Sequence, residues 1–221
     1  MSGYAFDDGI PVADIDPGTT VLVAGPALSR AEDLARSMVA DGTAYGDGML
    51  FISTNMTTKK LLEACERTHP EFDTDRAGVI DCSGQDLGQA RFDVQVKSVS
   101  TQSDITGIGM KFSALYESLY ADATDGRVRS SLISLSSLSM YVDLRQLYQF
   151  AQTLSGRIDS ADGLGVFSID PTTHDTKTVN TLSQVADGRI EVRESNGDED
   201  GELRVRGLHD QPDGWQPFSL E

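Results

Sequence analysis

Basic residues are scarce in this sequence. Of 221 residues, 18 are lysine or arginine and 35 are aspartate or glutamate, which gives a formal net charge of −17 and a pI near 4.4. Only five lysines are present, and no run of lysine or arginine could neutralise successive phosphates. We therefore expect no nucleic acid among the partners of this protein.

Long apolar runs and cysteines are scarce as well. No apolar run approaches the roughly 18 residues of a membrane-spanning helix, and no signal peptide is evident. The two cysteines, Cys65 and Cys82, are typical of a reducing cytosol. These features predict a cytoplasmic protein with no membrane partner.

The acidic residues are spread along the chain, from Asp7 to Glu221. A large negative charge keeps a protein soluble and is typical of proteins that work in high salt. The composition therefore predicts a halophilic protein, from a haloarchaeon. A mesophilic protein with one acidic tail is the alternative, and it fits the even distribution less well.

Strand-like and helix-like segments alternate along the chain. This alternation predicts an α/β fold with a mainly parallel central sheet and helices on both faces. The runs 189–194 and 202–208, joined by the turn-rich SNGDEDG, predict a C-terminal β-hairpin. The expected strands are 20–25, 49–54, 77–82, 130–135 and 164–169, with 91–99 as a half-exposed or edge strand. The expected helices are 30–41, 57–68, 104–123, 142–158 and 176–186. We expect residues 1–18 to form an acidic lead-in, 19–208 one domain, and 209–221 an irregular tail.

The segment VLVAGPALSRAEDL (21–34) joins a strand to a helix where a phosphate-binding loop would lie. Such a loop requires a second glycine, then lysine, then serine or threonine, but this chain has Arg30, Ala31 and Glu32. Ser29 and Glu32 have the spacing of a capping box, in which each side chain accepts the backbone N–H of the other residue. That box would occupy the donors that a phosphate needs, so we favour an ordinary capped helix over phosphate binding.

The order of segments resembles the KaiC/RadA-like branch of the RecA-superfamily ATPases, and more narrowly a haloarchaeal group of single-domain KaiC-like proteins of unknown function. The resemblance covers about residues 19–208. It implies a RecA-like P-loop NTPase fold that assembles with itself or with a RecA-like paralogue. The segments that carry it are VLVAGPALSRAEDL (21–34), DGMLFISTNMTTKKLLE (47–63), SDITGIGMKFS (103–113), ISLSSLSMYVDLRQLYQFAQTLSGRI (133–158) and DGLGVFSID (162–170).

The chain departs from this family where ATP hydrolysis needs specific residues. Relatives have GPPxTGK in the loop and DSLSxLLMY on a later strand, whereas this chain has Arg30 and Ala31 in the loop. The resemblance places the magnesium-binding carboxylate at Ile133 or Ser134, and neither residue is acidic. It places the catalytic glutamate just after the second strand, where Asn55 could orient a water molecule but could not accept its proton at neutral pH.

Two other residue pairs could carry chemistry. Cys65 and His69 are four residues apart on a predicted helix, but no second ligand pair lies nearby, so we favour a core thiol and a surface imidazole over a metal site. His174 and Asp175 could serve acid–base chemistry, although TTHD is also typical of a loop and a helix cap, which we favour. We therefore expect no catalytic residues, no cofactor and no metal.

The favoured hypothesis is a non-catalytic RecA/KaiC-like protein that acts through protein–protein contact in a regulatory or scaffolding role. One alternative is a nucleotide-binding switch or weak ATPase in which Arg30 replaces the Walker A lysine. A third hypothesis is a phosphate-ester enzyme that uses His174.

Lowering the salt concentration should unfold the protein or make it less compact. The excess negative charges repel one another, and the Debye length grows from about 3 Å at 1 M salt to about 30 Å at 0.01 M. Circular dichroism melting curves over this range of KCl concentration measure the effect. An unchanged melting temperature would argue against a halophilic origin.

Overall fold

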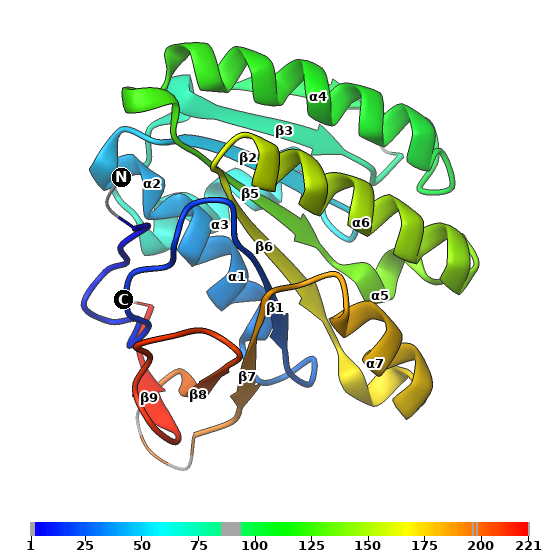
Figure 1. Cartoon of the computed structure of the whole chain (residues 1–221). Coiled ribbons are helices and arrows are strands. Elements are labelled where there is room, and N and C mark those ends of the chain that lie inside the picture. The colour runs from blue at the N-terminus through cyan, green and yellow to red at the C-terminus, as the bar shows by residue number, and fades with distance from the viewer. Residues whose placement is uncertain (1–2, 85–93, 196, 198, 221) are drawn as a thin grey trace.

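A nine-stranded sheet with helices on both faces forms the centre of the molecule (Figure 1). The structure is a computed structural model, and it describes residues 3–84, 94–195, 197 and 199–220. No helix in this part of the chain is long and apolar enough to cross a membrane.

The regular elements follow the predicted alternation closely. The strands are β1 (Thr20–Ala24), β2 (Gly48–Ser53), β3 (Ala77–Asp81), β4 (Gln95–Ser98), β5 (Val128–Ile133), β6 (Leu164–Ile169), β7 (Gly188–Arg193), β8 (Gly201–Arg206) and β9 (Gln216–Phe218). The helices are α1 (Ala31–Ala40), α2 (Gly42–Tyr45), α3 (Thr58–Thr68), α4 (Ile105–Asp122), α5 (Leu135–Leu138), α6 (Leu144–Ser160) and α7 (Thr176–Ser183), with 3-10 turns η1 (Thr74–Arg76), η2 (Thr124–Gly126) and η3 (Pro171–Thr173).

The predicted sheet and hairpin are confirmed. The strand order is β4-β3-β2-β5-β6-β1-β7-β8-β9, in which neighbours from β4 to β7 pair in parallel. The strands β8 and β9 add antiparallel pairs at one end. The predicted edge strand at 91–99 is confirmed at β4, while residues 91–93 lie outside the described part of the chain.

The expectation of an irregular tail after Asp210 is wrong for three residues. Gln216–Phe218 pairs with β8 as β9. Phe218 and Leu220 bury their side chains in the core at 2% and 5% exposure. Burial of these apolar side chains stabilises the strand. The sequence did not reveal it, because polar and turn-forming residues around it obscure the apolar alternation of a strand.

Alternate residues of the central strands face two separate apolar layers. In β1, Val21 and Val23 face the layer that contains α1 and α3 side chains, and Leu22 and Ala24 face the layer with α4, α6 and α7. Figure 1 shows α4 and α6 extending along one face of the sheet. Because the strands from β1 to β7 are parallel, the loops that follow β1, β2, β5 and β6 come together at one edge.

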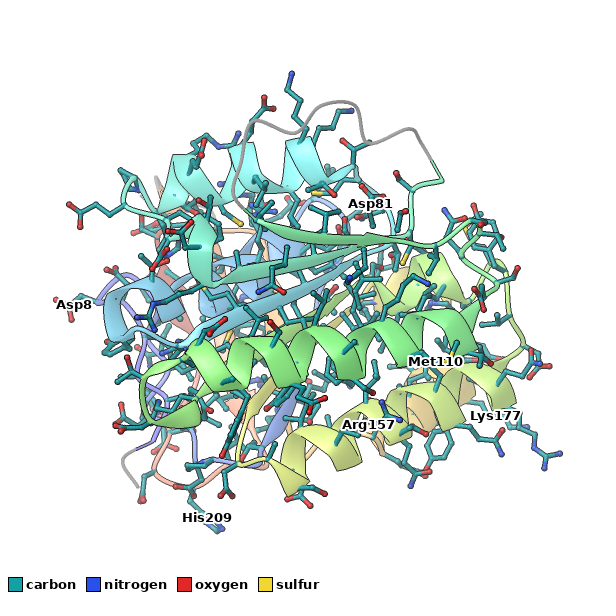
Figure 2. All side chains as sticks on the ribbon, turned by 90° about the horizontal axis from the view of Figure 1, so that it is seen from above. Asp8, Asp81, Met110, Arg157, Lys177 and His209 are labelled. Carbon is teal, nitrogen blue, oxygen red and sulfur yellow. The ribbon has the colours of Figure 1, made fainter. Side chains whose placement is uncertain are left out.

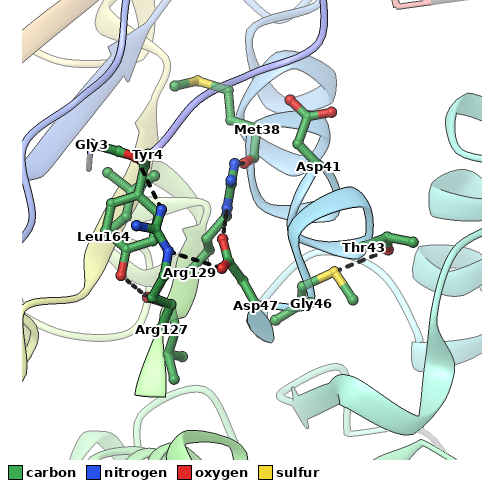
Figure 3. A network of polar contacts seen from close by, with 12 residues as sticks. Gly3, Tyr4, Met38, Asp41, Thr43, Gly46, Asp47, Arg127, Arg129 and Leu164 are labelled. Carbon is green, nitrogen blue, oxygen red and sulfur yellow. Dashed lines mark hydrogen bonds and ion pairs between the residues drawn. The ribbon is translucent and has the colours of Figure 1, made fainter. Parts of the chain in front are cut away.

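A buried ion-pair network lies at the opposite edge of the sheet (Figure 3). Asp47 accepts hydrogen bonds from the Nε atoms of Arg127 and Arg129 at 3.1 and 2.7 Å. Arg129 is fully buried, and its Nη1 donates to the carbonyl of Met38 in α1 at 3.1 Å. The guanidinium of Arg127 lies 4.1 Å from the ring centre of Tyr4. The network thus joins the N-terminal segment, the start of β2, β5 and α1.

Asp47→Asn should lower the free energy of unfolding by about 3–5 kcal/mol, because a fully buried arginine would lose its carboxylate. Urea unfolding at constant KCl concentration measures the change. Asp16→Asn is the control, since it removes the same charge from an exposed side chain. Equal destabilisation by both substitutions would contradict a specific contribution of the network.

Candidate functional site

A pocket of about 390 Å³ lies at the carboxyl edge of the sheet. Ligand sites of α/β proteins commonly lie at this edge. Its walls come from the loop after β1, from Asn55 after β2, from the serines of the α5 region, and from Asp170 and His174 after β6. The loop that the sequence singles out therefore does border a cavity.

The loop after β1 has a backbone suited to glycine at two places. Arg30 adopts the left-handed conformation, with φ 62° and ψ 16°, at the position of the second glycine of a phosphate-binding loop. A Cβ added to Gly25 would lie 2.9 Å from the carbonyl oxygen of Val192, so this first glycine is required by close packing. Arg30 thus adopts a backbone conformation that glycine would adopt at a lower energetic cost.

The capping box predicted for Ser29 and Glu32 is wrong. The Ser29 hydroxyl donates to the carbonyl of Pro26 at 2.7 Å. Glu32 instead accepts a hydrogen bond from Asn55 Nδ2 at 2.7 Å. A capping box requires the serine to be the N-cap residue. Here the left-handed Arg30 is the N-cap residue, and it makes no side-chain capping hydrogen bond.

The guanidinium group of Arg30 is held by acidic residues outside the pocket lining. Its Nε lies 2.9 Å from Asp33, and its Nη2 lies 3.1 Å from Asp200. None of the described residues that line the pocket is lysine or arginine, whereas Glu32 and Asp170 are acidic. The pocket wall therefore carries carboxyl groups where a bound phosphate would be stabilised by positive charge.

The ends of β2 and β5 are joined by short hydrogen bonds. Thr54 Oγ1 donates to the carbonyl of Ile133 at 2.6 Å and accepts from the N–H of Ser134 at 2.7 Å. The side chain of Ile133 is buried in the core, and Ser134 Oγ accepts from the N–H of Ser137 at 3.4 Å. The positions that the resemblance assigns to magnesium binding and to water activation thus lie side by side. They are occupied by a buried isoleucine and by hydroxyl groups in place of carboxylates.

His174 and Ser136 form a polar contact inside the pocket that the sequence reasoning missed. His174 Nε2 lies 2.9 Å from Ser136 Oγ, which also accepts from the N–H of Asp170 at 3.0 Å. The serine-rich stretch at 130–139 is the signal that could have suggested it. The predicted helix cap after His174 is confirmed, because Asp175 accepts from the N–H of Thr178 at 2.7 Å.

Comparison with known proteins identifies the family. The model of DUF7504, a family of unknown function, matches residues 18–192. The chain belongs to this DUF7504 family. No curated protein matches it. Among solved structures it is similar to a KaiC-like protein from the hyperthermophilic archaeon Pyrococcus horikoshii OT3, with a TM-score of 0.68, 12% identity, and coverage of 99% of this chain and 94% of that chain. At this identity the likeness shows the fold alone, and the predicted KaiC-like, RecA-type fold is confirmed.

The Cys65–His69 pair of this DUF7504 protein lies in two different environments. Cys65 is buried, and burial raises the pKa of its thiol to about 12. His69 is partly exposed, with Nε2 2.7 Å from Asp41 Oδ1 and Nδ1 2.9 Å from Thr68 Oγ1. Within the described ranges, no group of three or more histidine, cysteine, aspartate or glutamate side chains is placed to hold a metal ion.

Asp81 is a buried carboxylate at the carboxyl end of β3 that the sequence reasoning also missed. It accepts from the N–H and the hydroxyl of Thr58 at 2.7 and 2.8 Å, and from the N–H of Ser83 at 2.8 Å. Burial raises the pKa of Asp81, but these hydrogen bonds outweigh that effect, so the pKa is lowered overall. Asp81 therefore holds the start of α3 against the end of β3.

Asp81→Asn should lower the free energy of unfolding at pH 7 by about 1–3 kcal/mol, because buried N–H donors lose their charged acceptor. The wild-type contribution of Asp81 is fully present above its unfolded pKa of about 3.9 and is lost as the pH falls through the lower folded pKa. The variant should therefore lose less stability than wild type upon acidification.

Urea unfolding at constant KCl concentration from pH 7 to about pH 3 tests this difference. Asp8→Asn is the control, because Asp8 is exposed and projects at the periphery (Figure 2). Parallel pH profiles for wild type and Asp81→Asn would contradict the assignment.

Proposed function

We propose that this DUF7504 protein is a non-catalytic RecA/KaiC-like protein of the haloarchaeal cytoplasm. It acts in a regulatory or scaffolding role through contact with another protein, which is either a second copy or a RecA-like paralogue. The observation that carries the proposal is the acidic character of the pocket, whose described lining contains Glu32 and Asp170 and no lysine or arginine.

The charged residues that ATP hydrolysis requires are missing from the corresponding positions of this chain. Phosphoryl transfer depends almost wholly on positioning and on stabilisation of negative charge. The lysine position is occupied by Ala31, and the position of the magnesium carboxylate by Ile133 or Ser134. Thr54 and Asn55 follow β2, where the water-activating glutamate is expected, and Asn55 donates to the carboxylate of Glu32. ATP hydrolysis would lack all three contributions.

Exposed apolar side chains in the pocket lining, or next to lining residues in sequence, support a contact role. Leu28, in the loop after β1, is 81% exposed, and Met140, which borders the pocket, is 80% exposed. Tyr141 follows with 49% exposure. Contiguous patches of exposed apolar side chains mark protein–protein contact sites, and we propose that these three side chains belong to one.

The nucleotide-switch alternative has one observation in its favour. Arg30 keeps the left-handed backbone of a glycine position, and no side-chain cap occupies the start of α1, so backbone N–H groups there are available to an anion. Arg30 would have to leave both Asp33 and Asp200 to reach a phosphate. The phosphate-ester alternative rests on the contact between His174 and Ser136.

The wild-type protein should not hydrolyse ATP above background or bind magnesium–ATP tightly. The combined substitutions Arg30→Gly, Ala31→Lys and Glu32→Thr should recover some nucleotide binding, because they restore a cation and remove a carboxylate. Turnover should stay absent, because the carboxylates at the ends of β2 and β5 would still be missing.

Calorimetry with magnesium–ATP in molar KCl, paired with a phosphate-release assay, tests the wild type and the triple variant. Arg30→Gln alone is the control for the alternative. Micromolar affinity in the wild type that is lost in Arg30→Gln would show that Arg30 does the work of the lysine, and the nucleotide-switch function would then replace the one proposed here.

A further inference from the structure

One face of the C-terminal strands carries a concentration of arginine. In the antiparallel register, Arg189 lies opposite Arg206, Glu191 opposite Arg204, and Arg193 opposite Glu202. The intervening side chains point into the core, so these six side chains share the outer face. We call this set the arginine face; its members are Arg189, Glu191, Arg193, Glu202, Arg204 and Arg206.

The arginine face is positive on a strongly negative protein. Four arginines and two glutamates give it a charge of +2, whereas the chain as a whole carries −17. The rest of the chain therefore carries −19. Figure 1 shows β7, β8 and β9 at the end of the sheet far from β3 and α4. The face is thus a local exception to the charge of the molecule.

Both carboxylates of the face already accept hydrogen bonds from arginines beside them. Glu191 accepts hydrogen bonds from Arg204, and from Arg206 Nε at 3.2 Å. Burial raises the pKa of Glu191, but its arginine neighbours outweigh that effect and lower it overall. Glu202 accepts from Arg193 Nε at 2.7 Å. Both glutamates are therefore already paired with arginines of the face, and an excess of two cations remains.

The excess charge is concentrated at the facing pair Arg189 and Arg206. Like charges directly opposite on neighbouring strands repel each other. Arg189 Nε has no hydrogen-bond partner, and its nearest carboxylate oxygen, on Glu191, lies 3.9 Å away. The side chain of Arg206 is 55% exposed, and its Nε forms an ion pair with Glu191 at 3.2 Å. An added carboxylate beside the two guanidinium groups would relieve the repulsion between them.

A tryptophan lies beside the other two arginines. The guanidinium groups of Arg193 and Arg204 lie 4.2 and 4.6 Å from the ring centre of Trp215. This cation–π contact restricts both side chains and lowers the entropy that they lose upon binding. Trp215 is also the single tryptophan of the chain, so its fluorescence reports on this face.

We propose that the arginine face binds a short carboxylate-rich segment of a different protein. Planar guanidinium groups match carboxylates in pairs, and an excess of +2 suits a segment with a few acidic side chains. Nucleic acid fits less well, because two excess charges neutralise few phosphates. A second copy fits less well too, because it would bring its own charge of −17 toward this protein.

The inference deepens the proposed function by naming the chemistry of the partner, and it rests on that function in taking a protein as the partner. Its test uses the full chain and a fluorescein-labelled hexaglutamate peptide, with binding followed by anisotropy and by Trp215 fluorescence. Hexaglutamine and a six-nucleotide oligothymidylate, labelled in the same way, are the comparison probes. The KCl concentration is set to the lowest value at which circular dichroism shows the wild type and each variant to be folded.

Hexaglutamate should bind saturably and change the Trp215 signal. Arg189→Gln combined with Arg206→Gln should weaken binding by about tenfold or more, because two charge-assisted contacts are lost. Arg67→Gln combined with Arg145→Gln is the matched control: both side chains are exposed on other elements and make no ion pair within the described chain. Should the first double variant not fold, Arg206→Gln alone tests the exposed member of the pair and should still weaken binding several-fold.

Four results would overturn the inference: no saturable hexaglutamate binding, equal weakening by both double variants, tighter binding of the oligonucleotide, or self-association that depends on Arg189 and Arg206. None of these reports on the pocket. ATP turnover by the wild type would instead refute the proposed function and leave peptide binding unaffected.

Discussion

The fully buried pairing of Asp47 with Arg129 is the interaction on which the arrangement of the sheet depends. It places the start of β2 beside the start of β5, and Arg129 also bonds to the carbonyl of Met38 in α1. Neither charge could be buried without the other, since an unpaired buried charge costs several kcal/mol. The parallel strands that begin at this network end together at the opposite edge, where the pocket lies.

The pocket edge combines a RecA-type fold with an acidic lining. The loop after β1 has a glycine at Gly25 and a left-handed residue at Arg30. Its one cation is directed to Asp33 and Asp200. The hydroxyl of Thr54 joins the ends of β2 and β5, because it donates to the carbonyl of Ile133 and accepts from the N–H of Ser134. The backbone of the loop after β1 thus has the shape of a phosphate-binding loop, but its surroundings lack the positive charge. The proposed contact function depends on that lack of positive charge.

The scarce arginines occupy a few distinct environments. Arg127 and Arg129 hold the interior, Arg30 holds the loop after β1 to the link before β8, and four more form the arginine face. Arg30, Arg127 and Arg129 each pair with a carboxylate of this chain. On the arginine face, by contrast, four arginines share two carboxylates, and the positive charge that remains suits an acidic partner segment.

Local sequence pattern determined the strands, the long helices and their alternation, because apolar periodicity reports burial on one face or two. It also determined that the loop after β1 lacks a lysine. Tertiary structure alone decided which distant side chains meet: Arg129 with Asp47, His174 with Ser136, and Glu191 with Arg204. It also decided where α1 begins. The S-x-x-E spacing predicted a capping box at Ser29, but packing around Gly25 and the ion pairs of Arg30 moved the first helical residue to Ala31, because caps depend on backbone dihedrals that spacing does not contain.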